Sequence, residues 1–123
     1  TGVPWAVATS GRVVSARPTL AVLGIDIDKA PVVTRDQVRY AKPDPDLFLT
    51  AAAQIGVDIR DSIVVGDSVW DLLAARRAGA LGIGLLSGGY GREELIYAGA
   101  FRVYEDPGDL LAHLDEVGVR RPA

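Results

Sequence analysis

One junction between a strand and a helix, near the middle of the chain, constrains the fold more than any other feature. A short β-branched run at residues 63–65 stops at Gly66 and Asp67, and from Ser68 onward apolar residues recur at helical spacing. This pattern predicts a buried strand that is followed directly by a helix. If the helix begins near Ser68, Asp71 falls in its first turn, within reach of Asp67.

Apolar runs and helical patterns alternate along the whole chain. Strands are predicted at residues 5–8, 31–34, 63–66, 81–86 and 101–104, and helices at 13–23, 45–55, 68–78, 93–98 and 107–114. Pro18 predicts a kink in the first helix or a start near Arg17, and Asp44 with Pro45 is expected to provide the N-cap and first residue of the second. Such alternation predicts an α/β fold, a single domain built as a Rossmann-like three-layer sandwich around a mainly parallel sheet.

The composition excludes several classes of function. With 123 residues, of which 49% are hydrophobic and 24% charged, the chain is expected to form one globular core. A formal net charge of -3 provides no basic field for a nucleic-acid backbone. The chain has no cysteine and one histidine, His113, which excludes disulfides, thiolate chemistry and a Cys/His zinc site. Since no apolar stretch approaches a membrane span and no N-terminal signal is visible, a cytoplasmic protein is expected.

Polar side chains follow three of the predicted strands. Thr9 and Ser10 follow the first strand, Lys42 lies on the loop after the second, and Asp67 follows the third. In open α/β sheets ligands bind outside the carboxyl ends of the strands, so these side chains are expected to meet there. The sequence thus predicts a site that combines hydroxyls, an ammonium group and carboxylates.

The two acids at the central junction allow two interpretations. Like charges held this close repel each other unless one is protonated or a cation lies between them, and Mg²⁺ is the hard ion that suits carboxylate oxygens. In the other interpretation, Asp67 is an N-cap and Asp71 complements the helix dipole. A hydroxyl donor, a lysine and an acid-bound Mg²⁺ together match the needs of phosphoryl transfer, in which catalysis is mainly positioning and charge stabilisation.

Short motifs carry a resemblance to a known family. They occur in the order V-A-T-S-G at 7–11, K-P-D-P at 42–45, and G-D-S-V-W-D at 66–71 followed by Ala74, Ala75, Ala78 and Gly79. They resemble the second, third and fourth motifs of the haloacid dehalogenase-like (HAD) hydrolases, notably of the phosphoglycolate-phosphatase and β-phosphoglucomutase-like branch. The resemblance is to the C-terminal part of that family and covers nearly all of residues 3–116.

The resemblance implies a role for each matching residue. Thr9 would hydrogen-bond the transferring phosphoryl group, with Ser10 beside it, and Lys42 would neutralise charge on that group and on the nucleophile. Asp67 would hold Mg²⁺ directly or through water, and Asp71 would support it as the second residue of the metal site. The implied reaction is the hydrolysis of small phosphorylated metabolites through an aspartyl-phosphate.

The first motif of the family is missing. This motif, D-x-D-x-[TV] after an N-terminal strand, supplies the nucleophilic aspartate and the general acid/base, and nothing before Thr9 matches it. The internal candidate, Asp26 with Asp28, follows a helix end, lacks the trailing Thr or Val and comes after the second motif. That context favours solvent-facing acids in a loop.

The mobile cap of this branch, usually inserted between the first and second motifs, is missing as well. The chain starts with Thr1, contains no Met and reaches a predicted core strand within a few residues. We therefore expect that upstream sequence is missing or has been removed. The 123 residues alone are expected to be poorly active or inactive, because the covalent step lacks its nucleophile.

Several alternatives are left open by the sequence. The same scaffold could serve a phosphomutase or a dehalogenase, although an acid pair suited to Mg²⁺ favours phosphate chemistry. A non-catalytic, degenerate relative is a further alternative. A receiver-like domain is disfavoured because its acidic pair comes before its lysine, whereas here Lys42 comes first.

Trp70 is expected to pack at the edge of the helix–sheet layer and Tyr90 to belong to a mobile loop. The substrate and the oligomeric state do not follow from the sequence.

Overall fold

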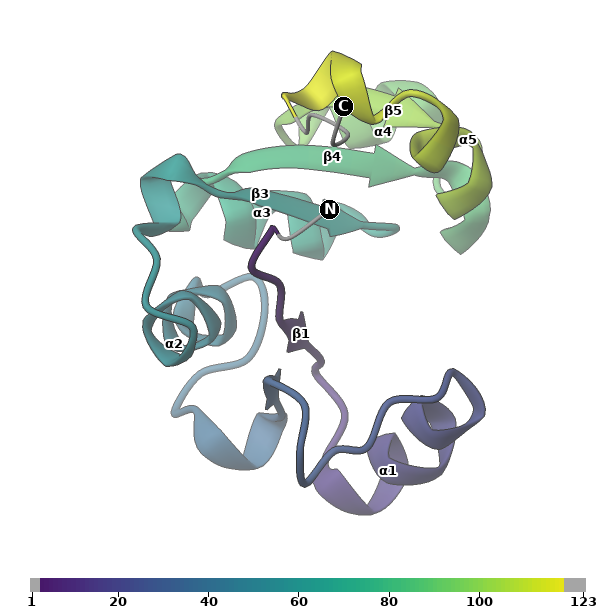
Figure 1. Ribbon diagram of the computed structural model, residues 1–123. Helices are drawn as coiled ribbons and strands as arrows, with labels where there is room; N and C mark the ends of the chain where they lie inside the picture. Colours follow the sequence, from purple (N-terminus) through teal and green to yellow (C-terminus); the bar gives the residue numbers. More distant parts are fainter. Residues whose placement is uncertain (1–2, 119–123) are drawn as a thin grey trace.

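The computed structural model describes residues 3–118, in which short strands alternate with helices (Figure 1). The order is β1 (Val7–Ala8), α1 (Val13–Val22), β2 (Val32–Val33), α2 (Asp46–Gln54), β3 (Ile63–Gly66), α3 (Val69–Ala78), β4 (Leu81–Leu85), α4 (Arg92–Tyr97), β5 (Ala100–Tyr104) and α5 (Pro107–Ala112). Short 3₁₀ helices lie at η1 (Arg35–Gln37), η2 (Ile59–Asp61), η3 (Leu86–Gly88) and η4 (Leu114–Val117). Each strand pairing is parallel, which confirms the predicted α/β class.

The strands lie in two sheets, where one sheet was expected. β1 pairs with β2, and the second sheet has the order β3-β4-β5. The amides of Val7 and Thr9 both donate to carbonyls beside or within β2, so the backbone groups of Ala8 face the opposite edge of β1. Within residues 3–118 no strand pairs with that edge. Ala8 packs instead against the cluster that contains Val64 of β3, so side chains rather than backbone hydrogen bonds connect the two sheets.

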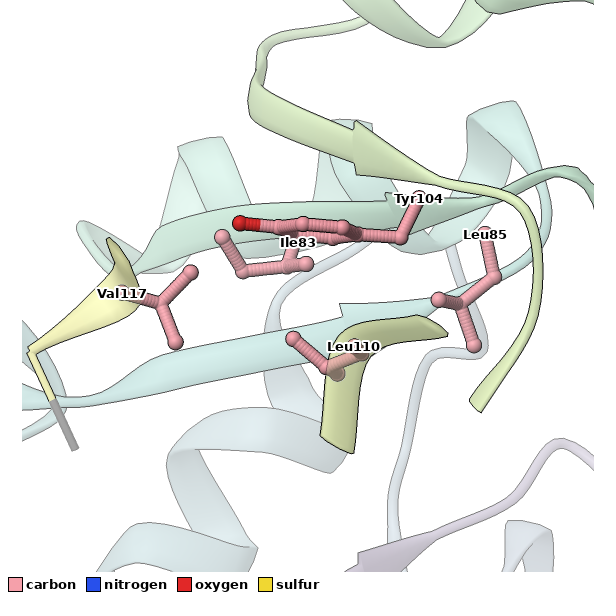
Figure 2. Packing of buried hydrophobic residues seen from close by; sticks show 5 residues of the cluster. All are labelled: Ile83, Leu85, Tyr104, Leu110 and Val117. Carbon is pink, nitrogen blue, oxygen red and sulfur yellow. The ribbon is translucent and has the colours of Figure 1, made fainter. Parts of the chain in front are cut away.

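One face of the three-stranded sheet is covered by the C-terminal helices. Figure 2 shows the cluster that fills this layer: Ile83 and Leu85 of β4, Tyr104 of β5, Leu110 of α5 and Val117 of η4. Ile83 is fully buried, and the hydroxyl of Tyr104 donates to Glu116 Oε1 at 2.9 Å. The apolar side chains that alternate along β4 thus all point to the same layer.

The opposite face of this sheet carries α3 and α4, which approach β4 closely because two of its residues are glycines. A Cβ on Gly82 would lie 3.5 Å from Leu72 of α3, and one on Gly84 would lie 3.1 Å from Leu95 of α4. Leu72 and Leu95 are themselves buried in one cluster with Val103. The three-layer arrangement predicted from the sequence is therefore present around this sheet.

The smaller sheet is covered on both faces too. Its apolar residues divide between two clusters, one with α1 (Ala16, Leu20 and Val32) and one with α2 (Val33, Leu47 and Ala51). Helix α2 also contacts α3, so it links the two sheets on one side.

Helix α1 begins at Val13, as the predicted range 13–23 has it, and not near Arg17. It runs through Pro18, because the carbonyl that loses an amide partner belongs to Val14, which is 87% exposed to water. Other predicted boundaries were wrong. Helix α2 starts one residue later than expected, with Pro45 rather than Asp44 at the N-cap position. The first strand is shorter than predicted, since it extends only as far as its pairing with β2.

No helix within residues 3–118 is both long enough and apolar enough to cross a bilayer.

Candidate functional site

The start of α3 brings the two acids of the central junction together. Ser68 is the N-cap, and its side chain accepts the amide N–H of Asp71 at 3.2 Å. Asp71 Oδ2 in turn accepts the amides of Asp67 at 3.2 Å and of Ser68 at 3.3 Å. The predicted place of Asp71 in the first turn is confirmed, whereas the N-cap is Ser68 and not Asp67. Asp71 therefore orders the backbone that carries Asp67.

Two glycines allow this tight arrangement. A Cβ on Gly66 would lie 2.7 Å from Asp71 Cγ, and a Cβ on Gly88 would lie 2.7 Å from Asp67 Cγ, both closer than real Cβ atoms approach. Gly88 ends η3, which follows β4, so the loop after β4 packs directly against Asp67. This role of Gly88 was not identified from the sequence; the available signal was the set of three glycines at positions 88, 89 and 91, within the segment expected to be a mobile loop around Tyr90.

Lys42 connects the three motif regions. Its Nζ lies 2.7 Å from Asp71 Oδ1 and donates to the carbonyl oxygen of Ala8 at 3.4 Å. The side chains of Lys42 and Asp71 are each 13% exposed, so water screens their attraction less than at an open surface. The loop around Lys42 is held in turn by Arg77 of α3, whose Nη1 donates to the carbonyl of Pro43 at 3.3 Å.

Thr9 and Ser10 follow β1 at the same end of the structure. The amide of Thr9 donates to the carbonyl of Val33 at 2.9 Å, which extends the pairing of β1 with β2. Thr9 Oγ1 accepts the amide of Gly11 at 3.0 Å, so this side chain forms a turn while its hydroxyl hydrogen can still be donated elsewhere. Thr9 directly follows Ala8, whose carbonyl Lys42 contacts, whereas Ser10 is exposed.

Asp26 and Asp28 lie elsewhere. They occupy the turn between α1 and β2, which in a parallel arrangement is at the amino end of β2 and not at the end that carries Thr9. Both acids are exposed, as expected for loop acids, and Asp28 pairs with Arg17 at 2.6 Å. Hydrogen bonding to Arg17 lowers the pKa of Asp28.

Of the two carboxylates at the junction, one is available to a divalent cation and the other already has protein partners. The carboxylate of Asp67 is exposed and has neither a hydrogen bond nor an ion pair within residues 3–118, so its oxygens are available as ligands. Both oxygens of Asp71 already have protein partners. No cluster of three or more Asp, Glu, His or Cys side chains occurs in the described range. Because Mg²⁺ commonly takes only one or two carboxylates beside water and phosphate oxygens, Asp67 with Asp71 behind it fits such an ion.

The structure places the two aromatic residues discussed above. Trp70, in the first turn of α3, is 51% exposed, which is compatible with the expected place at the edge of the layer. Tyr90 lies in the loop between η3 and α4, as expected, and packs against the cluster of Leu72, Leu95 and Val103.

Comparison with known proteins identifies the family of this chain. A model of the haloacid dehalogenase-like hydrolases matches residues 1–79. A phosphoglycolate phosphatase from Agrobacterium fabrum is 37% identical over 87 residues, which are 71% of this chain and 37% of that protein. The crystal structure of a hydrolase from Pseudomonas syringae superimposes with a TM-score of 0.93 at 57% identity, over 95% of this chain and 54% of that one.

A second related structure was solved with bound ligands. A HAD family hydrolase from Deinococcus radiodurans, solved with bound phosphate and sodium, has a TM-score of 0.86 and 33% identity, over 99% of this chain and 56% of that one. The chain thus spans about half the length of these solved structures, and less of the curated relative. On the match of motifs, sequence and fold, the chain belongs to the haloacid dehalogenase-like hydrolases, in the branch of the phosphoglycolate phosphatases and β-phosphoglucomutase-like proteins.

Proposed function

We propose that the protein to which this chain belongs is a Mg²⁺-dependent phosphatase that hydrolyses small phosphorylated metabolites through an aspartyl-phosphate. The observation that carries the proposal is the position of Lys42, 2.7 Å from Asp71 and 3.4 Å from the carbonyl that precedes Thr9. This contact joins a hydroxyl, a cation and an acid-bearing loop at one place, which is the combination that stabilises a transferring phosphoryl group.

Each residue has one task in this proposal. The hydroxyl of Thr9 donates to a phosphoryl oxygen, with Ser10 beside it, and Lys42 neutralises charge on that group. Asp67 holds Mg²⁺, which when bound offsets the negative charge of the phosphoryl oxygens. Asp71 supports the metal site from behind, because it fixes both the ammonium of Lys42 and the amide of Asp67.

The nucleophile belongs to a segment outside these 123 residues, as does the cap. A nucleophilic carboxylate oxygen attacks phosphorus, the bond to the substrate oxygen breaks, and the leaving oxygen takes a proton from the general acid and departs as an alcohol. Water then gives a proton back to the same group, now the general base, and attacks the acyl phosphate, which releases phosphate and restores the carboxylate. Residues 1–123 are proposed as the C-terminal portion of a single core domain.

The place for the missing strand is the space between β1 and β3. Ala8 directs its backbone groups to the edge of β1 that lacks a partner within residues 3–118, and Val65 in β3 is 45% exposed although it lies in a core strand. A parallel strand there would join the two sheets and bring its carboxyl end beside Lys42. The length of the related structures, about twice that of this chain, supports such a segment.

The test is Mg²⁺-dependent release of phosphate from an aryl phosphate and from phosphoglycolate. The 123-residue chain should give no turnover, and the protein extended by its upstream sequence should be active. In the extended protein, Asp67→Asn should abolish turnover because a metal ligand is lost, whereas Asp26→Asn should leave it unchanged because Asp26 lies in a remote turn. An extended protein that binds but never hydrolyses phosphate esters would instead favour a non-catalytic relative.

A further inference from the structure

Phe48 of α2 lies beside the candidate site, although the proposed reaction assigns it no role. The Nζ of Lys42 is 5.1 Å from the centroid of the Phe48 ring, within the ~6 Å range in which a cation is attracted to an aromatic ring. Phe48 is 8% exposed and packs in one cluster with Val64, Ala74 and Ala75. The ring therefore has a fixed position between α2 and α3.

The hydrogen bonds of Lys42 leave one donor without an oxygen partner. A lysine ammonium has three N–H donors. Asp71 Oδ1 lies 2.7 Å from Nζ and the carbonyl oxygen of Ala8 lies 3.4 Å from it. No further oxygen partner of Nζ exists within residues 3–118. Within residues 3–118, one N–H of Lys42 is therefore left for a group that this part of the chain does not supply.

The kind of neighbour matters for a cation that must attract phosphate. Asp71 already balances the charge of Lys42, and the proposed nucleophile would bring a further carboxylate to this place. Each additional carboxylate held against Nζ would weaken the attraction of the site for a phosphoryl anion. An aromatic ring attracts the ammonium through its quadrupole but carries no net charge. It also compensates part of the hydration that Lys42 loses, since the lysine side chain is only 13% exposed.

We propose that Phe48 is a positioning residue of this site: its ring holds the ammonium of Lys42 in place without adding negative charge, so that the ammonium can serve the phosphoryl group and the nucleophile. The proposal rests on the function proposed above as far as the phosphoryl group is concerned. The contact between the ring and the ammonium can be tested independently of that function. The opposing explanation is that Phe48 only fills the core.

A double-mutant cycle on the 123-residue chain separates the two explanations. Phe48→Leu, Lys42→Met and the double variant are unfolded in urea at neutral pH. If the ring attracts the cation, Lys42→Met should lower the folding equilibrium constant more in the wild-type background than in the Phe48→Leu background, by about twofold to thirtyfold. A side chain that only fills the core gives equal effects in both backgrounds, which would overturn the proposal.

The chain offers a matched control. Lys29 is its only other lysine and is exposed, so a cycle of Phe48→Leu with Lys29→Met should show no coupling. If Phe48→Leu does not fold, trifluorophenylalanine placed at position 48 keeps the shape of the ring while it weakens the negative ring face. The effect of Lys42→Met should then shrink in the same direction, and an unchanged effect would contradict the proposal.

Lysine labelled with ¹³C at Cε provides a spectroscopic measurement with two signals, one from each lysine. The methylene of Lys42 should be shielded by the ring relative to that of Lys29, and Phe48→Leu should remove the difference. Equal shifts in the wild-type chain would refute the contact. In the protein extended by its upstream sequence, inorganic phosphate with Mg²⁺ should move the Lys42 signal, which is assigned by its loss in Lys42→Met. If the cycle shows coupling but phosphate does not move that signal in the extended protein, the contact stands and the proposed function fails.

Discussion

Gly66→Ala should destabilise the folded chain, because the added methyl group would displace Asp71 of the candidate site. Gly66 is the last residue of β3, and its backbone passes directly beside the side chain of Asp71. A Cβ at this position would lie 2.7 Å from Asp71 Cγ. Carbon atoms in contact lie about 3.5–4.0 Å apart, so Asp71 has to move by about 1 Å.

The loss of stability depends on the contacts that Asp71 makes. Forcing extra volume into a packed site costs about 1–3 kcal/mol. Movement of Asp71 also lengthens its 2.7 Å ion pair with Lys42. Separation of a buried ion pair costs about 3–5 kcal/mol, and this range is an upper limit here because both side chains are 13% exposed. Against this, Gly→Ala stabilises by about 0.4–1 kcal/mol through the unfolded state. We expect a net loss of about 2–4 kcal/mol.

The assay is urea unfolding of the 123-residue chain, followed by circular dichroism, with Gly82→Ala as the control. Gly82 lies in the neighbouring strand β4, opposite Val64, and a Cβ there would meet nothing closer than Leu72 at 3.5 Å. The control should therefore stay within about 1 kcal/mol of the wild type. Equal stability of the two variants would refute the close packing of β3 against Asp71.

Two further predictions concern other parts of the fold. Gly88→Ala should lower the free energy of unfolding in urea by about 1–3 kcal/mol, because its Cβ would meet Asp67. The control is Gly108→Ala in the first turn of α5, where a Cβ would meet only Asp106 Oδ1 at 3.3 Å and should not destabilise the fold. Equal losses of stability in the two variants would contradict the contact of Gly88 with Asp67. Burial, and then the hydrogen bond to Glu116, raise the pKa of Tyr104. The protonated phenol therefore contributes stability that is complete below the unfolded pKa of about 10 and is lost as the pH rises through the folded value. Between about pH 9 and 11, Tyr104→Phe should lose less stability than the wild type; parallel losses would show that Tyr104 is not the group responsible.

Much of this architecture could be predicted from local patterns in the sequence. The β-branched run at residues 63–65, the start of a helix near Ser68 and Gly79 as its left-handed C-cap, with φ of 90°, all act over a few neighbouring residues. The same holds for Asp106 before Pro107 at the start of α5. Such signals are readable from the sequence because strand periodicity and helix capping depend on residues at most four positions apart.

Only the tertiary structure decided what the candidate site residues contact. The sequence placed Asp67 and Asp71 at one junction, but the partner of Asp71 is Lys42, brought there by the packing of a loop against α3. The contacts of Gly88 with Asp67 and of Phe48 with Lys42 likewise join separate elements. The division into two sheets is also a long-range property. Whether an edge of β1 is paired depends on which strand lies beside it and not on the sequence of β1 itself. Local pattern thus determined the elements and the motifs, while packing between distant segments determined how the charges are paired.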